Sequence, residues 1–432
     1  MKAHLTTVML LSAIGLGGSL PAQEFEQAPI LYGKAAPQNR FSQLVERIQS
    51  GETSLEYDPR SGYLRSLLDT LGISTSSQTL VFSKTSLQRQ RISPRTPRAL
   101  YFADDLYVGY CQHGEVLEVS AVDPELGAVF YTVSQTERDR PQISRQSDNC
   151  LICHASSQTK EVPGHLVRSL FVDNAGMPIL SAGSHRVNQT TPFANRWGGW
   201  YVTGTHGRQT HLGNLVIDGE NVPSHVDNAK GLNVTDLRDR FDTTAYLSPH
   251  SDLVALMVLE HQTDLHNLIT RAGFGTRQAM HYQQTLNREL SEPADHEWDS
   301  TKTRIRSACD PLVEYMLFSG EARLDHPVRG TSGFDEQFVR TGPRDRRGRS
   351  LRELDLETRL FKYPCSYLIY SPSFQALPRE AKDYVLERLR RVLMGEDTSG
   401  RFAHLTPDDR QAILEIVRDT MPDLPASWQQ PD

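Results

Sequence analysis

Cysteine is scarce in this sequence, and long apolar runs are missing beyond its first residues. With 5 cysteines in 432 residues, the chain is not one of the small disulfide-dense scaffolds. The longest later apolar run, residues 253–259, is far shorter than the roughly 18 residues of a membrane span. The chain also lacks a large excess of one charge, since its net charge is only −7. This mild acidity argues against a nucleic-acid partner. We therefore expect a globular chain with no membrane span in its mature part.

The first residues have the pattern of a secretory signal peptide. Lys2 supplies a short basic segment, residues 8–20 are apolar and rich in glycine, and Ala22 is a suitable cleavage residue. No cysteine lies near this point, which argues against a lipid anchor. We expect residues 1–22 to be a signal peptide and the mature protein to be exported to the periplasm.

Two of the cysteines lie close together in DNCLICHASS, where Cys150, Cys153 and His154 form a C-x-x-C-H motif. A zinc site would need a second ligand pair, and the other three cysteines are isolated in the sequence. A thioredoxin-like pair would lie between a strand and a helix, in a βαβ setting. The third interpretation is covalent attachment of haem, for which this spacing is the signature. Because haem is attached outside the bacterial inner membrane, the signal peptide favours this third interpretation.

The motif resembles that of c-type cytochromes, which carry electrons in the periplasm. The resemblance implies that Cys150 and Cys153 hold one haem c covalently and that His154 is the proximal iron ligand. The stretches PRALYFADDLYVGY, RWGGWYVTGTHG and RLFKYPCSYLIYS also resemble a family of exported bacterial proteins with one such motif and no assigned activity. We expect a monohaem cytochrome that relays single electrons between periplasmic donor and acceptor proteins. The alternatives are a haem-dependent, peroxidase-like oxidoreductase with an open sixth iron position, or a haem-based sensor.

The sixth iron ligand decides between these functions. His206 is slightly favoured, because the glycines beside it allow close approach of the backbone. Met177, which precedes a proline, and His261, in an apolar stripe, are its rivals. His165 and His185 are weaker candidates, and the sequence does not separate these alternatives. A second metal on residues 260–266 is not expected, because the HExxH spacing is absent.

Aromatic residues near the motif are candidates for packing against the haem, namely Trp197, Trp200 and Tyr201. A strand pair with glycine turns and core aromatics is the alternative interpretation of that stretch. Arg168 and Arg196 are candidate partners of the haem propionates, although an ordinary structural role is more common for each.

The sequence predicts an α+β fold in four parts. Residues 1–22 are the signal peptide, 23–91 a helical lead-in, 92–240 a β-rich haem-binding region and 241–432 a helical C-terminal region. The apolar spacing predicts amphipathic helices at 41–50 and 62–73, and β-branched and aromatic residues predict a small sheet within 100–135. A hairpin is expected around residues 174–176, and Thr406 with Asp409 predicts the start of a C-terminal helix. Cys309 and Cys365 are a candidate disulfide pair.

Overall fold

The computed structural model describes residues 24–219, 222, 223 and 226–429. The predicted signal peptide lies outside these residues. Among the described residues, no helix is long and apolar enough to cross a membrane.

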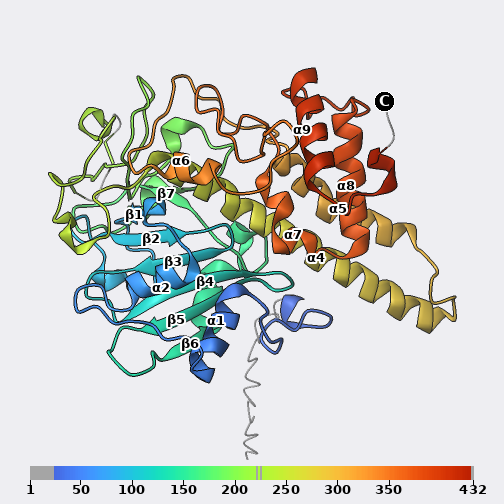
Figure 1. Cartoon of the computed structure of the whole chain (residues 1–432), viewed down its shortest axis with the longest axis horizontal. Helices are drawn as coiled ribbons and strands as arrows, with labels where there is room; N and C mark the ends of the chain where they lie inside the picture. Colours follow the sequence, from blue (N-terminus) through green and yellow to red (C-terminus); the bar gives the residue numbers. More distant parts are fainter. Residues whose placement is uncertain (1–23, 220–221, 224–225, 430–432) are drawn as a thin grey trace, which may run out of the picture.

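A seven-stranded antiparallel sheet forms one half of the molecule (Figure 1), with the strand order β6-β5-β4-β3-β2-β1-β9. Alternation of side chains makes its two faces different. In β4, for example, Leu117, Val119 and Ala121 are buried on one face, whereas Val116 and Glu118 are half-buried on the other. The strands are β1 Thr79–Val81, β2 Arg98–Phe102, β3 Leu106–Tyr110, β4 Val116–Asp123, β5 Gly127–Ser134, β6 Ile143–Gln146 and β9 Trp200–Tyr201.

Two N-terminal helices, α1 Arg40–Ser50 and α2 Leu64–Leu71, cover the apolar face of the sheet. Asn39 caps α1 through a capping box with Ser42, and Gly51 ends it in the left-handed conformation, which glycine adopts without strain. Both helices bury one apolar stripe against the strands, as the spacing at 41–50 and 62–73 predicts.

The opposite face of the sheet has two halves. We call the buried half, formed by Phe102, Tyr107, Ser120, Val122 and Phe130, the inner half. Helix α4 (Leu253–Leu290) is bound to it, since Gln262 donates a hydrogen bond to the Tyr107 hydroxyl at 2.9 Å and Phe102, Tyr107 and Val122 share a core cluster with α4.

We call the other half of this face the outer half. It consists of the half-exposed side chains of Val116, Glu118, Thr132, Ser134 and Ser144. In the strand register Gly109, Glu118, Thr132 and Ser144 lie in one row across β3 to β6.

The C-terminal region is helical and lies to the right of the sheet in Figure 1, with α4 extending from the sheet toward it. The side chain of Asp252 caps α4 at the amide groups of residues 254 and 255. The predicted capping box of Thr406 and Asp409 is confirmed at the start of the last α-helix. The other helices of this region are α5 Asp299–Met316, α6 Phe334–Val339, α7 Pro372–Gln375, α8 Arg379–Leu393 and α9 Pro407–Thr420.

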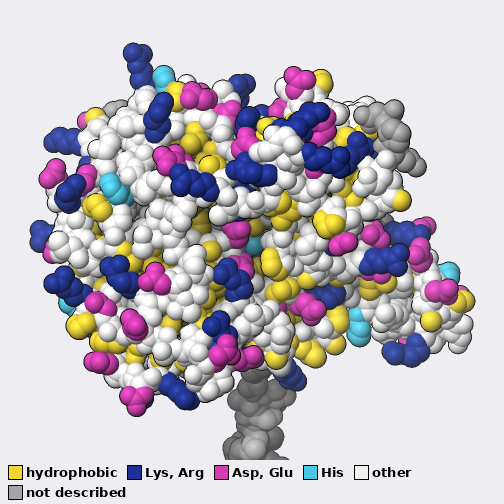
Figure 2. All heavy atoms as spheres, viewed as in Figure 1, with side chains coloured by type: hydrophobic (Ala, Val, Ile, Leu, Met, Phe, Trp, Pro, Cys, Tyr) yellow, Lys and Arg dark blue, Asp and Glu magenta, His cyan; other side chains and the backbone are white. Residues whose placement is uncertain are grey.

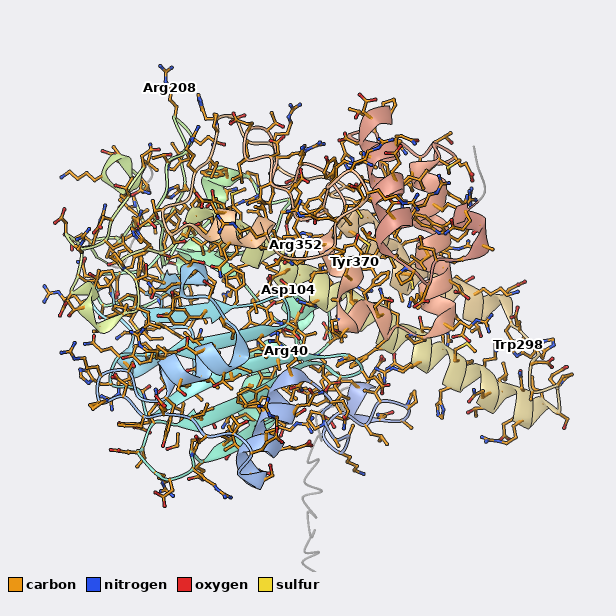
Figure 3. The ribbon with its side chains drawn as sticks, in the orientation of Figure 1. Arg40, Asp104, Arg208, Trp298, Arg352 and Tyr370 are labelled. Carbon is orange, nitrogen blue, oxygen red and sulfur yellow. The ribbon has the colours of Figure 1, made fainter. Side chains whose placement is uncertain are left out.

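An ion pair joins the C-terminal region to the sheet. Asp104 lies in the turn between β2 and β3, and its Oδ2 is 2.9 Å from Nη1 of Arg352. Both residues lie near the centre of the molecule in Figure 3. The Arg352 guanidinium also stacks over the rings of Phe338 and Tyr367. Around this junction, Figure 2 shows basic and acidic side chains interspersed on the molecular surface.

Short elements connect the two regions. Strands β7 (Arg168–Leu170) and β8 (Ser184–Arg186) form the predicted hairpin around residues 174–176, and helix α3 (Asp148–His154) directly follows β6. The 3-10 turns are Glu24–Glu26, Thr75–Ser77, Arg89–Arg91, Ser157–Thr159, Leu180–Ala182, Phe193–Asn195, Ala229–Gly231, Thr243–Ala245, Tyr367–Tyr370 and Ala426–Gln429.

The mixed helical and antiparallel β structure confirms the α+β class in outline. Strand β1 lies within the predicted helical lead-in but belongs to the main sheet, so the boundary drawn between residues 91 and 92 runs through that sheet. The predicted disulfide is wrong, because Cys309 and Cys365 are both free and buried. Both residues pack within the apolar core cluster of the C-terminal region.

Candidate functional site

The C-x-x-C-H motif forms the short helix α3, which begins two residues after β6 ends. Side chains three and four residues apart lie on the same side of a helix, so Cys150, Cys153 and His154 project to one side. Both thiols are free, with Cys150 half-buried and Cys153 exposed. The motif therefore presents two unpaired thiols at the edge of the sheet.

The imidazole of His154 is held by the backbone ten residues later. Its Nδ1 lies 2.9 Å from the Gly164 carbonyl oxygen, and the Gly164 amide donates to the His154 carbonyl at 2.8 Å. The ring also packs against Phe130, with the two centroids 4.8 Å apart. Because a carbonyl oxygen only accepts, Nδ1 carries the proton and Nε2 has the lone pair, the arrangement typical of metal-binding histidines. Burial lowers the pKa of His154, which favours this neutral form.

An ion pair between Arg98 and Glu118 lies on the sheet beside the motif, with 2.6 Å between Nη2 and Oε2. Burial raises the pKa of Cys150 to about 11; Glu118 raises it further and Arg98 lowers it. The same two charges act on the pKa of His154. The Arg98 guanidinium lies over Gly109, where any Cβ atom would overlap it. A side chain at position 109 would therefore push the Arg98 guanidinium aside.

A second histidine, His165, lies close to the motif but is buried on the inner half of the sheet. Its Nε2 is 2.7 Å from the Ser120 hydroxyl, and its ring packs on Tyr107. Asn267 of α4 clamps its backbone by bonding both the amide and the carbonyl group. His165 therefore connects the motif to α4, and burial lowers its pKa well below the ordinary value.

The candidates for the sixth iron ligand lie in different environments. Met177 is in the hairpin between β7 and β8, and its side chain is 50 % exposed. His185, in β8, is exposed as well. His206 is fully buried, and its Nε2 accepts the Asn233 amide at 3.0 Å.

His261 has partners at both ring nitrogens. Nδ1 bonds the Gln189 side chain and Nε2 the Ser366 hydroxyl, each at 2.7 Å. Its ring also stacks on Phe318 and Tyr315 in the core of the C-terminal region. Both imidazoles thus hold hydrogen bonds in the interior, and the choice among His206, Met177 and His261 as the sixth ligand stays a prediction.

The three aromatic candidates also have partners in the protein core. Trp197 is fully buried and donates to the Glu260 carboxylate, and Trp200 donates to the Arg168 carbonyl at 2.8 Å. Tyr201 donates to the Pro94 carbonyl at 2.6 Å. Within the described part of the chain, none of the hydrogen bonds or ring contacts of these side chains reaches α3. In this structure the three side chains are core aromatics, as the alternative interpretation of this stretch has it. Their packing against a haem remains a prediction.

The two arginines proposed as propionate partners are bound elsewhere. Arg196 forms a buried ion pair with Glu260 at 3.0 Å, and Arg168 donates to the Ser184 hydroxyl across the hairpin. The cation beside the motif is Arg98, which sequence reasoning missed. Glu118 in VLEVSAVD could have indicated it, because a carboxylate within an apolar strand requires a partner.

A hollow of about 500 Å³ opens on the outer half of the sheet. Hydroxyl and amide side chains of β4, β5, β6 and the adjoining turns line it, namely Gly114, Glu115, Val116, Thr132, Ser134, Gln135, Thr136, Gln142 and Ser144. Its volume lies within the ~300–1,000 Å³ range of ligand and cofactor sites. Sequence reasoning did not find this hollow, because its walls come together through strand pairing.

No group of three or more His, Cys, Asp or Glu residues in the described ranges converges on a point that could hold a metal ion. Comparison with family models, with curated proteins and with solved structures gives no match for this chain.

Proposed function

We propose that this protein is an exported monohaem c-type cytochrome that relays single electrons between periplasmic redox partners. The observation that carries the proposal is the geometry of α3. Two free thiols lie one helical turn apart, and the hydrogen bond from His154 Nδ1–H to the Gly164 carbonyl leaves Nε2 unprotonated. This donor set fits a haem c, which needs two thiols for its vinyl groups and one neutral imidazole for its iron.

In this proposal Cys150 and Cys153 form the thioether bonds and His154 Nε2 is the proximal ligand. The bound haem supplies reversible one-electron chemistry at its iron. The Gly164 carbonyl fixes the imidazole orientation and increases its basicity as a ligand. Phe130 limits rotation of the ring from the other side. Because Cys153 is exposed, a haem attached through it would be accessible to a redox partner from the surface.

Met177 is our candidate for the sixth position. Met177 is 50 % exposed, whereas His206 and His261 hold hydrogen bonds in the interior. Methionine ligation would raise the reduction potential relative to a second histidine.

A haem-dependent oxidoreductase is the second candidate function, and the engagement of both buried histidines favours it. If Met177 does not reach the iron, the sixth position stays open to small molecules such as peroxide. A haem-based sensor requires the same open position.

The first experiment tests covalent attachment in cells equipped for cytochrome c maturation. We expect a haem-staining band at the mass of the mature protein on a denaturing gel. Cys150→Ser combined with Cys153→Ser should abolish the stain, whereas Cys111→Ser should leave it unchanged. A wild-type band without stain would refute the cytochrome proposal.

An optical spectrum then separates the two functions. Low-spin bands that carbon monoxide does not change would support the carrier. High-spin bands that shift with carbon monoxide would favour the oxidoreductase or the sensor.

A further inference from the structure

A second cavity, with a volume of about 280 Å³, lies where the sheet meets the C-terminal helices. Its walls come from the turn between β4 and β5, from the middle of α4, and from α7 with the connection to α8. Figure 1 shows α7 beside α4 at this junction. No residue of α3 lines the cavity, so the motif does not account for it. Joints between two parts of a protein are common places for ligand sites.

We propose that this cavity binds a small organic acid. The apolar body of the acid fills the cavity, and its carboxylate pairs with Arg277 at the edge. The site does not depend on a bound haem, so it stands or falls separately from the proposed function.

Apolar side chains from two sides enclose the body of the ligand. Ile269 and Phe274 of α4 lie on one side and Leu377, after α7, on the other, and all three are buried. An apolar lining with few polar groups is the usual composition of a small-molecule site.

Gly273 of α4 keeps part of the cavity open. Glycine is unfavourable inside a helix relative to alanine, and no close contact requires it here. A Cβ atom at this position would meet nothing nearer than the Leu377 Cδ2 atom at 3.6 Å. The missing side chain therefore leaves space that a larger residue could have filled.

Arg277 is the cation of the cavity. It donates a hydrogen bond to the backbone carbonyl of Glu125, and its guanidinium carbon lies 5.1 Å from the centroid of the Phe274 ring. Burial lowers its pKa, whereas the charges of Glu125 and Asp123 raise it. Neither carboxylate forms an ion pair with Arg277 in the described part of the chain. The remaining N–H groups are therefore left for an acceptor, and a guanidinium pairs best with a carboxylate.

The volume limits the size of the acid. It lies just below the ~300–1,000 Å³ of sites for drug-sized ligands. At about 30 Å³ for each group the size of a water molecule, the cavity holds roughly nine non-hydrogen atoms, which is the size of benzoate.

The test uses benzoate and its neutral counterpart benzamide as probes, titrated into the mature protein near pH 7 and followed by saturation-transfer NMR. We expect saturable binding of benzoate and at least about tenfold weaker binding of benzamide, because benzamide lacks the charge that strengthens the hydrogen bonds to a guanidinium. No saturable binding of benzoate, or equal binding of the two probes, would overturn the proposal.

Two variants place the binding in this cavity. Gly273→Met fills it and should abolish binding of both probes, and its thermal midpoint should not fall, because methionine favours the helix. Arg277→Gln leaves the cavity open and should remove the preference for benzoate.

Arg304→Gln is the matched control. Arg304 also lies over an aromatic ring, 4.5 Å from the centroid of Tyr282, but does not line the cavity, so this variant should bind both probes as the wild type does. Undiminished binding of benzoate by Gly273→Met or by Arg277→Gln would overturn the proposal, and so would equal weakening by Arg277→Gln and Arg304→Gln.

Discussion

Replacement of His261 by glutamine tests whether this buried histidine has a structural role or binds iron. Its two ring nitrogens hold Gln189 and Ser366, and burial lowers its pKa from 6.5 to about 3, with His266 adding to the effect. The neighbouring titratable groups Tyr315 and Tyr367 have pKa values raised by burial and stay neutral. His261 is therefore neutral in the folded protein throughout the mildly acidic range.

The sign and size of the effect follow from proton linkage. The folded-state pKa of His261 is depressed, so its contribution to stability is complete above about pH 6.5 and is lost as the pH falls toward 3. Each pH unit within this window costs about 1.4 kcal/mol for one proton, which amounts to about 3 kcal/mol at pH 4. In His261→Gln this part of the pH dependence disappears.

Urea denaturation between about pH 4.5 and pH 7.5 measures the difference in unfolding free energy between wild type and variant. Below about pH 6.5 we expect the unfolding free energy of the wild type to fall relative to that of His261→Gln. The expected difference is about 1.4 kcal/mol for each pH unit. His281→Gln, at an exposed position of the same helix, is the control and should keep the wild-type slope. A difference that does not vary with pH would refute the argument, and a changed haem spectrum would identify His261 as an iron ligand.

Three further predictions concern the site and its surroundings. Gly109→Ala should displace the Arg98 guanidinium from Glu118 and lower the free energy of unfolding in urea by about 2 kcal/mol. An unchanged midpoint of the urea denaturation would contradict the close approach of Arg98 to Gly109. Met177→Leu should make the iron accessible to carbon monoxide while His206→Ala leaves the visible spectrum unchanged, and the reverse result would restore His206 as the ligand. In the denatured holoprotein the three cysteines outside the motif should all react with Ellman's reagent, because they are free in the structure; a single reactive thiol would indicate a disulfide.

Local features of the fold could be predicted well because they depend on neighbours in the sequence. The capping box of Thr406 and Asp409 and the hairpin around residues 174–176 are set by a few adjacent residues. The amphipathic helices α1 and α2 follow from the spacing of their leucines and other apolar residues. Strand β1 escaped prediction because a three-residue strand has almost no periodicity, and its place in the sheet is decided by pairing with β2 and β9.

The roles of individual histidines could not be predicted in the same way. An apolar helix face shows that His261 is buried, but not that Gln189 and Ser366 hold both its nitrogens. Those partners are far away in the sequence and become neighbours only through helix packing. The same is true of Glu260, whose partners Arg196 and Trp197 lie in the glycine-rich stretch that suggested a haem pocket.

The sequence by itself determines the α+β class and the chemistry of the motif, because the spacing of Cys150, Cys153 and His154 puts them on one side of a single helical turn. Only the tertiary structure decides what surrounds them. Gly164 reaches His154 through a loop, and Arg98 meets Glu118 across β3. The open half of the sheet arises because α4 covers the other half. Spacing determines contacts within one turn, whereas contacts between distant segments depend on how the whole chain packs.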